Sequence, residues 1–333
     1  MKTNWRSIVN KSTGKKSSQC DTEIFIDGGT YFSHLTKSIK EAKGDDAFIY
    51  IMGWMLDVEF SLLKNGSRRD FLINLLLAAS ARGVQIRVLL WENPFYYGTN
   101  RKAVNEINNF HRGDAFAMID SLHRGPVRSR MALKKLKAKI PAKFLLTFWD
   151  GFLQKVFFSD SLKNTMPIHE LLKITDVASH HEKVILINSE KGLKAYCGGM
   201  DINKNRFDDQ NDVQCCVNLS AAHKILKRFL RRWRALKTNE SHDRIKIRSR
   251  ADELANKKMP SIRLAQERYS TVVTQSPYVE AIGTYNDPFF SGSTPDRSAK
   301  KTILSIIKNA KNIIYIEDQY MISHTIAKAL HDA

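Results

Sequence analysis

SHHEKVILIN, residues 179–188, begins with polar side chains and continues as an apolar run. The apolar part has the composition of a buried β-strand. Side chains alternate along a strand, so His181 and Lys183 fall on one face, where an imidazole and an ammonium can reach the same phosphate group. An imidazole can attack phosphorus, and an ammonium can neutralise charge on phosphoryl oxygens. Taken alone, such a pair is far more often a capping or core histidine beside a lysine at a solvated strand edge.

Strands and helices alternate on the N-terminal side of this stretch. Residues 31–42 carry apolar side chains at helical spacing, Gly44 ends the helix, and the strand FIYIMGW follows at 48–54. An apolar helix is expected at 71–83 and a further strand at 84–91. This order predicts an α/β fold, an α/β/α sandwich with a mixed, largely parallel sheet covered by helices on both faces.

The same plan returns near the end of the chain. TILSIIKNAKNIIYIEDQY, residues 302–320, again combines an amphipathic helix with a strand, and IIYIE echoes FIYIM. Two similar lobes are the simplest interpretation, and a chance likeness of two common units is the alternative. We expect a polar basic tail at 1–20, a first lobe at 21–236 with an insertion at about 92–177, a charged and partly helical connection at 237–268, and the incomplete start of a second lobe at 269–333.

The composition is that of a basic globular protein. A formal charge of +19 predicts attraction to a polyanion, either nucleic acid or an anionic membrane surface. The N-terminal residues lack the apolar core of a Sec signal peptide, and no uncharged apolar run reaches about 18 residues. We therefore expect synthesis in the cytoplasm without a transmembrane helix, followed by export or a peripheral membrane location. The four cysteines lack metal-binding spacing, so neither a metal nor another cofactor is expected.

Several motifs, in order, resemble the phospholipase D superfamily, whose signature is HxKxxxxD followed by a glycine pair and an Asn or Asp. His181, Lys183, Gly198, Gly199 and Asp201 fill those places, and GGMDINKNRFDD is similar to a run of the membrane-lipid branch. The resemblance implies the two-lobed phospholipase D-like fold and hydrolysis of a phosphodiester without a metal. One histidine attacks phosphorus to give a phosphohistidine, and a histidine of the other lobe protonates the leaving alcohol and then activates water.

The resemblance also implies individual roles. His181 would be the nucleophile, Lys183 would stabilise the phosphate charge, and Asp201 would form hydrogen bonds at the floor of the pocket. Glu317 and Gln319 lie in IIYIEDQYMIS, which is similar to a segment that borders the pocket in lipid-cleaving members. A purely structural role for Glu317 is the alternative.

The sequence also departs from the family pattern. Asn188 stands where the signature has an aspartate, so an amide replaces a charge, and the long spacer after it predicts an extended hairpin turn. No second HxK follows Ile307, and His324 and His331 are expected on the surface of a helix. We therefore expect the second half-site to come from another chain or from a missing C-terminal segment, and the isolated chain to be inactive or impaired.

Two features bear on the substrate. Basic residues between 124 and 143 precede an aromatic and aliphatic segment at 144–158, which suggests contact with a membrane surface. A solvated basic helix followed by a core helix is the alternative. The GG-x-D and EDQY motifs favour a membrane glycerophospholipid as the substrate. Nucleic acid, which the net charge would serve, is the less favoured partner, and a catalytically silent interaction module is the third possibility.

Overall fold

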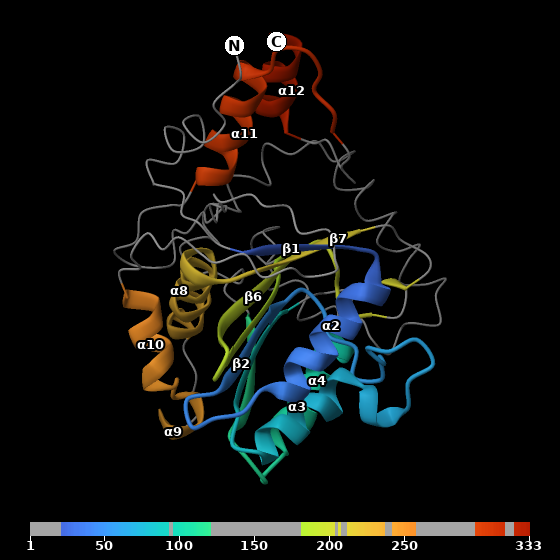
Figure 1. The fold of residues 1–333 in the computed structure, drawn as a ribbon, viewed down its shortest axis with the longest axis vertical. Coiled ribbons are helices and arrows are strands. Elements are labelled where there is room, and N and C mark those ends of the chain that lie inside the picture. Colours follow the sequence, from blue (N-terminus) through green and yellow to red (C-terminus); the bar gives the residue numbers. More distant parts are fainter. Residues whose placement is uncertain are drawn as a thin grey trace, which may run out of the picture.

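The computed structural model describes residues 21–92, 96–120, 181–203, 206–207, 212–236, 242–257, 297–316 and 323–333. A seven-stranded sheet has the order β1-β7-β6-β5-β2-β3-β4 (Figure 1). Its strands are β1 (Thr22–Ile26), β2 (Phe48–Gly53), β3 (Gln85–Trp91), β4 (Ala115–Asp120), β5 (Lys183–Ser189), β6 (Gly192–Gly198) and β7 (Val213–Val217).

The sheet is mixed, as the sequence predicted, but it is not largely parallel. Strands β2, β3 and β4 are parallel neighbours, with α3 (Leu72–Ala81) and α4 (Tyr97–Asn108) in the connections. The four other pairings between the described strands are antiparallel. Alternating strands and helices predict parallel strands only where each connection contains a helix. The connection between β5 and β6 contains none, and these two strands are antiparallel.

The turn of this hairpin is short. Ser189 pairs with Gly192, which leaves Glu190 and Lys191 as a two-residue connection. Gly192 has a φ of 92°, a conformation that glycine adopts without steric cost. The expectation of an extended turn was therefore wrong, because the strands pair as far as Ser189 and Gly192 and the connection has only two residues.

Helices cover both faces of the sheet. Helices α2 (Gly28–Glu41) and α3 pack on one face, and α8 (Leu219–Ala235) packs on the other. The central strand β2 serves both cores, because Ile49 and Ile51 join the first whereas Tyr50 and Met52 join the second. Burial on two sides explains why FIYIM is an unbroken apolar run. The expected sandwich is thus present, with α2 and α8 on opposite sides of the strands in Figure 1.

Two of the expected segments contribute to this body. Helix α4 and strand β4 lie inside the region expected to be an insertion from residue 92, and β4 extends the sheet beside β3. The apolar pattern that would predict α4 from the sequence is weak, because this helix buries only Asn100, Ala103 and Ile107. In the charged connection, α10 (Ser249–Asn256) packs on α8 and buries Ala251 and Leu254 in the second core. The short helix α9 (His242–Ile245) precedes it.

The C-terminal part is only partly as predicted. Helices α11 (Ser298–Asn309) and α12 (His324–His331) are present, and both histidines of α12 are exposed. The strand expected after α11 is wrong for Ile313–Ile316, which is not a strand and leaves Ile313 85% exposed. A strand needs a hydrogen-bonding neighbour, and no described strand pairs with this segment. Among the described helices, none is long and apolar enough to cross a membrane.

Candidate active site

The candidate site lies where the polar start of SHHEKVILIN meets the sheet. Lys183 is the first residue of β5 and pairs with Gly53, the last residue of β2. His181 precedes the strand by two residues, and Trp54 follows β2 directly. The central pair of strands therefore brings an imidazole, an ammonium and an indole to one edge of the sheet.

The structure brings His181 and Lys183 into contact. Lys183 Nζ lies 3.1 Å from His181 Nε2. A charged ammonium has no lone pair, so it donates this hydrogen bond and the imidazole nitrogen accepts it. The Trp54 ring meets the His181 ring edge-on with centroids 5.3 Å apart, and Lys183 Nζ lies 5.5 Å from the Trp54 centroid. The indole thus limits the space in which both groups can move.

A buried ion network holds the lysine from the other side. Lys183 Nζ lies 3.2 Å from Asp201 Oδ2, and Lys183 and Asp201 are 8% and 2% exposed. Arg206 lies 3.3 Å from the same Asp201 oxygen and 3.0 Å from Asp212 Oδ2. Asp201 therefore shares its charge between two cations, while Asp212 supplies a second carboxylate to the arginine.

Burial acts on both members of the central pair. It lowers the pKa of Lys183 from its usual value, and the neighbouring Asp201 opposes that shift. Burial likewise raises the pKa of Asp201, and the positive charges of Lys183 and Arg206 oppose it. Each partner thus favours the charged form of the other in a place that disfavours charge. The ammonium at Lys183 depends on Asp201 remaining ionised.

The glycine pair has a steric role in this network. Gly198 pairs with Gln214 across β6 and β7, and a Cβ on Gly198 would collide with the Val213 carbonyl. A Cβ on Gly199 would collide with the Asp212 carboxylate. Two residues without side chains therefore let the end of β6 approach the chain that carries Asp212, so that this carboxylate can reach the arginine.

Three contributors were not among the residues expected from the sequence. Arg206 and Trp54 contact the expected side chains directly, and the Gln214 side chain donates to the Lys183 carbonyl at 3.5 Å. The Gln214 amide oxygen also accepts from the Met200 backbone at 3.4 Å. Arg206 lies within GGMDINKNRFDD, so this motif could have indicated that it belongs to the site. No motif indicates Trp54 or Gln214, because their partners come from other strands.

Asn188 does not belong to this site. It pairs with Phe48 near the far end of β5, about 17 Å along the strand from Lys183 at about 3.4 Å per residue. Its Nδ2 donates to the Asp46 carbonyl at 3.1 Å. The charge that this amide replaces would therefore lie at the far end of β5 from His181, and not beside the candidate site.

Glu317 and Gln319, the secondary candidates from the C-terminal motif, lie outside the described residues. Glu182, the residue between His181 and Lys183, has a different environment. Arg232 of α8 lies 2.5 Å from Asp120 and 3.9 Å from Glu182. The strand alternation that joins His181 and Lys183 thus sends Glu182 toward α8, where the arginine ties the helix to the sheet edge.

Comparisons with known proteins give likenesses of fold. No family model and no curated protein matches the chain. A phospholipase D family member, Nuc from Salmonella typhimurium, aligns with a TM-score of 0.36 and 13% identity over 64% of this chain and 95% of that chain. NucT from Helicobacter pylori aligns with a TM-score of 0.37 and 10% identity over 65% of this chain and 95% of that chain. At these values the chemistry rests on the residues of the site itself.

Replacing Asp201 with asparagine tests the ion network. Asp201→Asn leaves the buried Lys183 without its carboxylate, and loss of one partner of a buried pair costs about 3 kcal/mol of unfolding free energy. Urea unfolding measures this loss. The matched Asp45→Asn variant changes an exposed carboxylate and should shift stability by no more than about 0.5 kcal/mol. Equal stability of the two variants would contradict the network.

Proposed function

We propose that the chain is a phospholipase D-type phosphodiesterase that hydrolyses membrane glycerophospholipids, with His181 as the nucleophile. The single observation that carries the proposal is the 3.1 Å contact of His181 Nε2 with Lys183 Nζ, an ammonium that Asp201 holds at 3.2 Å. A nucleophile and a charge stabiliser that converge on one point are what phosphoryl transfer requires.

The contact suggests how the reaction begins. In the free site the lysine donates to the Nε2 lone pair, which is the electron pair needed for attack. A phosphodiester that enters between the two groups offers its oxygens to the ammonium instead, and this frees the lone pair. The bond from Nε2 to phosphorus then forms while the bond to the leaving alcohol breaks, and negative charge collects on oxygens that face Lys183.

The alcohol leaves with the electron pair of the broken bond and needs a proton. In this proposal a histidine of a second half-site, on another chain or another segment, supplies that proton and later takes one from water. The water attacks the phosphohistidine, which releases phosphatidic acid and restores His181. Asp201 takes no part in bond making; it keeps Lys183 charged and in place.

Two lines of support favour a lipid over nucleic acid. The GG-x-D run that places Asp201 is similar to the membrane-lipid branch, and so is the EDQY segment. The net charge of +19 favours nucleic acid as the second candidate, because a polyanion gains most from such a field. Lipid and nucleic acid can be distinguished by offering both substrates to the chain under the same conditions.

The nucleophile can be tested without the second half-site. Bis(4-nitrophenyl) phosphate has a leaving group that departs without protonation, so a burst of nitrophenolate stoichiometric with the protein is expected. His181→Ala should abolish the burst and the acid-labile phosphohistidine that accompanies it. His111→Ala, which removes an exposed histidine, should retain both. A burst that survives His181→Ala would refute the assignment.

Natural substrates decide between the candidates. With the second half-site supplied by the chain or segment that carries it, labelled phosphatidylcholine and phosphatidylethanolamine vesicles should give phosphatidic acid, and plasmid DNA in parallel should stay intact. Nicked plasmid with intact lipid would favour the nuclease, and turnover of neither would favour a silent interaction module.

The pH dependence of the burst tests the role of Lys183. Because burial lowers the pKa of Lys183, the burst rate should fall on the alkaline side below the usual lysine value of about 10.4. Asp201 opposes that shift, so Asp201→Asn should move the alkaline limb to still lower pH. Stopped-flow rates across the pH range give the alkaline limb of the unmodified chain and that of Asp201→Asn. An alkaline limb unmoved by Asp201→Asn would contradict the proposed coupling.

A further inference from the structure

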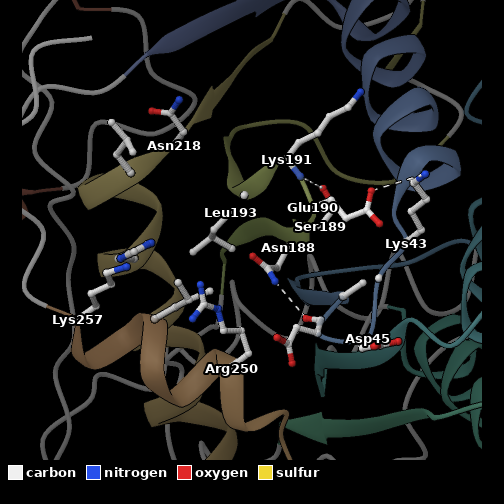
Figure 2. A pocket seen from close by; sticks show the side chains of 17 residues that line it. Lys43, Asp45, Asn188, Ser189, Glu190, Lys191, Leu193, Asn218, Arg250 and Lys257 are labelled. Carbon is white, nitrogen blue, oxygen red and sulfur yellow. Dashed lines mark hydrogen bonds and ion pairs between the residues drawn. The ribbon is translucent and has the colours of Figure 1, made fainter.

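A second concave site lies at the other end of β5. A cavity of about 720 Å³ is lined by the β5–β6 hairpin, by the loop before β2, and by residues of α8 and α10. Asn188 and Leu193 are central to the view in Figure 2, with Lys257 and Arg250 on one side and Glu190 and Lys43 on the other. His181 and Lys183 are not among the lining residues, so this cavity is separate from the candidate active site.

The wall formed by α8 and α10 is basic. It contains His223, Arg250 and Lys257, and the pKa of His223 is lowered first by burial and then by the charges of Lys257 and Arg250. His223 is 8% exposed, and its Nδ1 has no hydrogen-bond partner among the described residues. Lys257 forms no salt bridge within the described part of the chain, whereas Arg250 lies 2.6 Å from Glu253. Hydrogen-bonding capacity and positive charge are therefore left over on this wall.

The opposite wall carries carboxylates that are partly compensated. Glu190 lies 3.6 Å from Lys43, and the neighbouring Lys191 is paired with Glu41 outside the cavity at 2.7 Å. Asp45 and Asp46 precede β2 on the same side. The cavity is thus polarised across its width, and an anion would settle against the helices α8 and α10.

Asn188 contributes to this cavity and not to the candidate active site. It lines this cavity, is 6% exposed, and donates its amide to the Asp46 carbonyl. An aspartate at this position could not donate that hydrogen bond and would add a negative charge to the cavity. The neutral amide is therefore the residue type that an anion site would require.

We propose that this cavity binds the phosphate group of a small anion between His223, Arg250 and Lys257, with Asn188 keeping its floor neutral. Three groups that can each donate to phosphate oxygens line one wall, from α8, from α10 and from the residue that follows α10, and charge-assisted hydrogen bonds are the strong ones. The volume exceeds that of a bare phosphate, so an organic phosphate fits better than the inorganic ion. The inference does not rest on the proposed catalytic activity.

Calorimetric titration of the full chain with glycerol phosphate tests the site, with inorganic phosphate as the second probe. Lys257→Gln and Asn188→Asp should each weaken binding about tenfold or more, the loss expected for one charge-assisted hydrogen bond or one added repulsive charge. Lys227→Gln removes the same charge from an exposed position of α8 and should leave affinity unchanged. His181→Ala should bind as the unmodified chain does, which separates this cavity from the active site.

Failure of the unmodified chain to bind either phosphate would overturn the proposal, as would equal weakening by Lys227→Gln and Lys257→Gln. A third arm distinguishes the source of the phosphate. Sedimentation with phosphatidylcholine vesicles, with and without phosphatidic acid, should show no dependence on Lys257 if the ligand is soluble. Sedimentation that requires phosphatidic acid and is lost in Lys257→Gln would instead assign the cavity to a lipid headgroup. Unfolding curves of each variant confirm that the fold is retained.

Discussion

The ion pair between Lys183 and Asp201 is the constraint on which the rest of the site depends. A lysine that opens a buried strand would keep its charge poorly by itself, because burial disfavours the ammonium. The carboxylate restores that charge and also fixes the direction of the side chain, so that Nζ meets His181 Nε2. Without this ion pair, His181 would lie at the sheet edge with no positioned ammonium beside it.

The surrounding chain is arranged to keep this pair in place. Arg206 adds a second cation to Asp201 and is held in turn by Asp212, which can approach because Gly199 has no side chain. Trp54 closes the opposite side against the imidazole. The motif is therefore a packed unit. Gly199 leaves room for the Asp212 carboxylate, Asp201 and Asp212 hold Lys183 and Arg206, and Lys183 contacts His181.

Strand β5 carries two different environments at its two ends. Lys183 begins it at the candidate active site, and Asn188 lies near the other end, on the wall of a separate cavity. A motif read along the sequence makes these positions look like members of one site. The rise of an extended strand separates them, so the same seven-residue element can serve catalysis at one end and ligand binding at the other.

The sequence predicted what local patterns encode. The alternation in SHHEKVILIN placed His181 and Lys183 on one face, and FIYIM was predicted as a strand, which the structure buries on both sides. It could not predict features that arise between distant segments. The antiparallel half of the sheet depends on a tight turn at Gly192, and Trp54 joins the site only because β2 pairs with β5.

The most direct measurement is a crystal structure of the chain soaked with vanadate, which takes the geometry of a phosphoryl group under attack. We expect vanadium bonded to His181 Nε2, with an equatorial oxygen within hydrogen-bonding distance of Lys183 Nζ and the contact between those two nitrogens lengthened. Vanadate bound only elsewhere, or at this edge without a bond to Nε2, would contradict the assignment of His181 as the nucleophile.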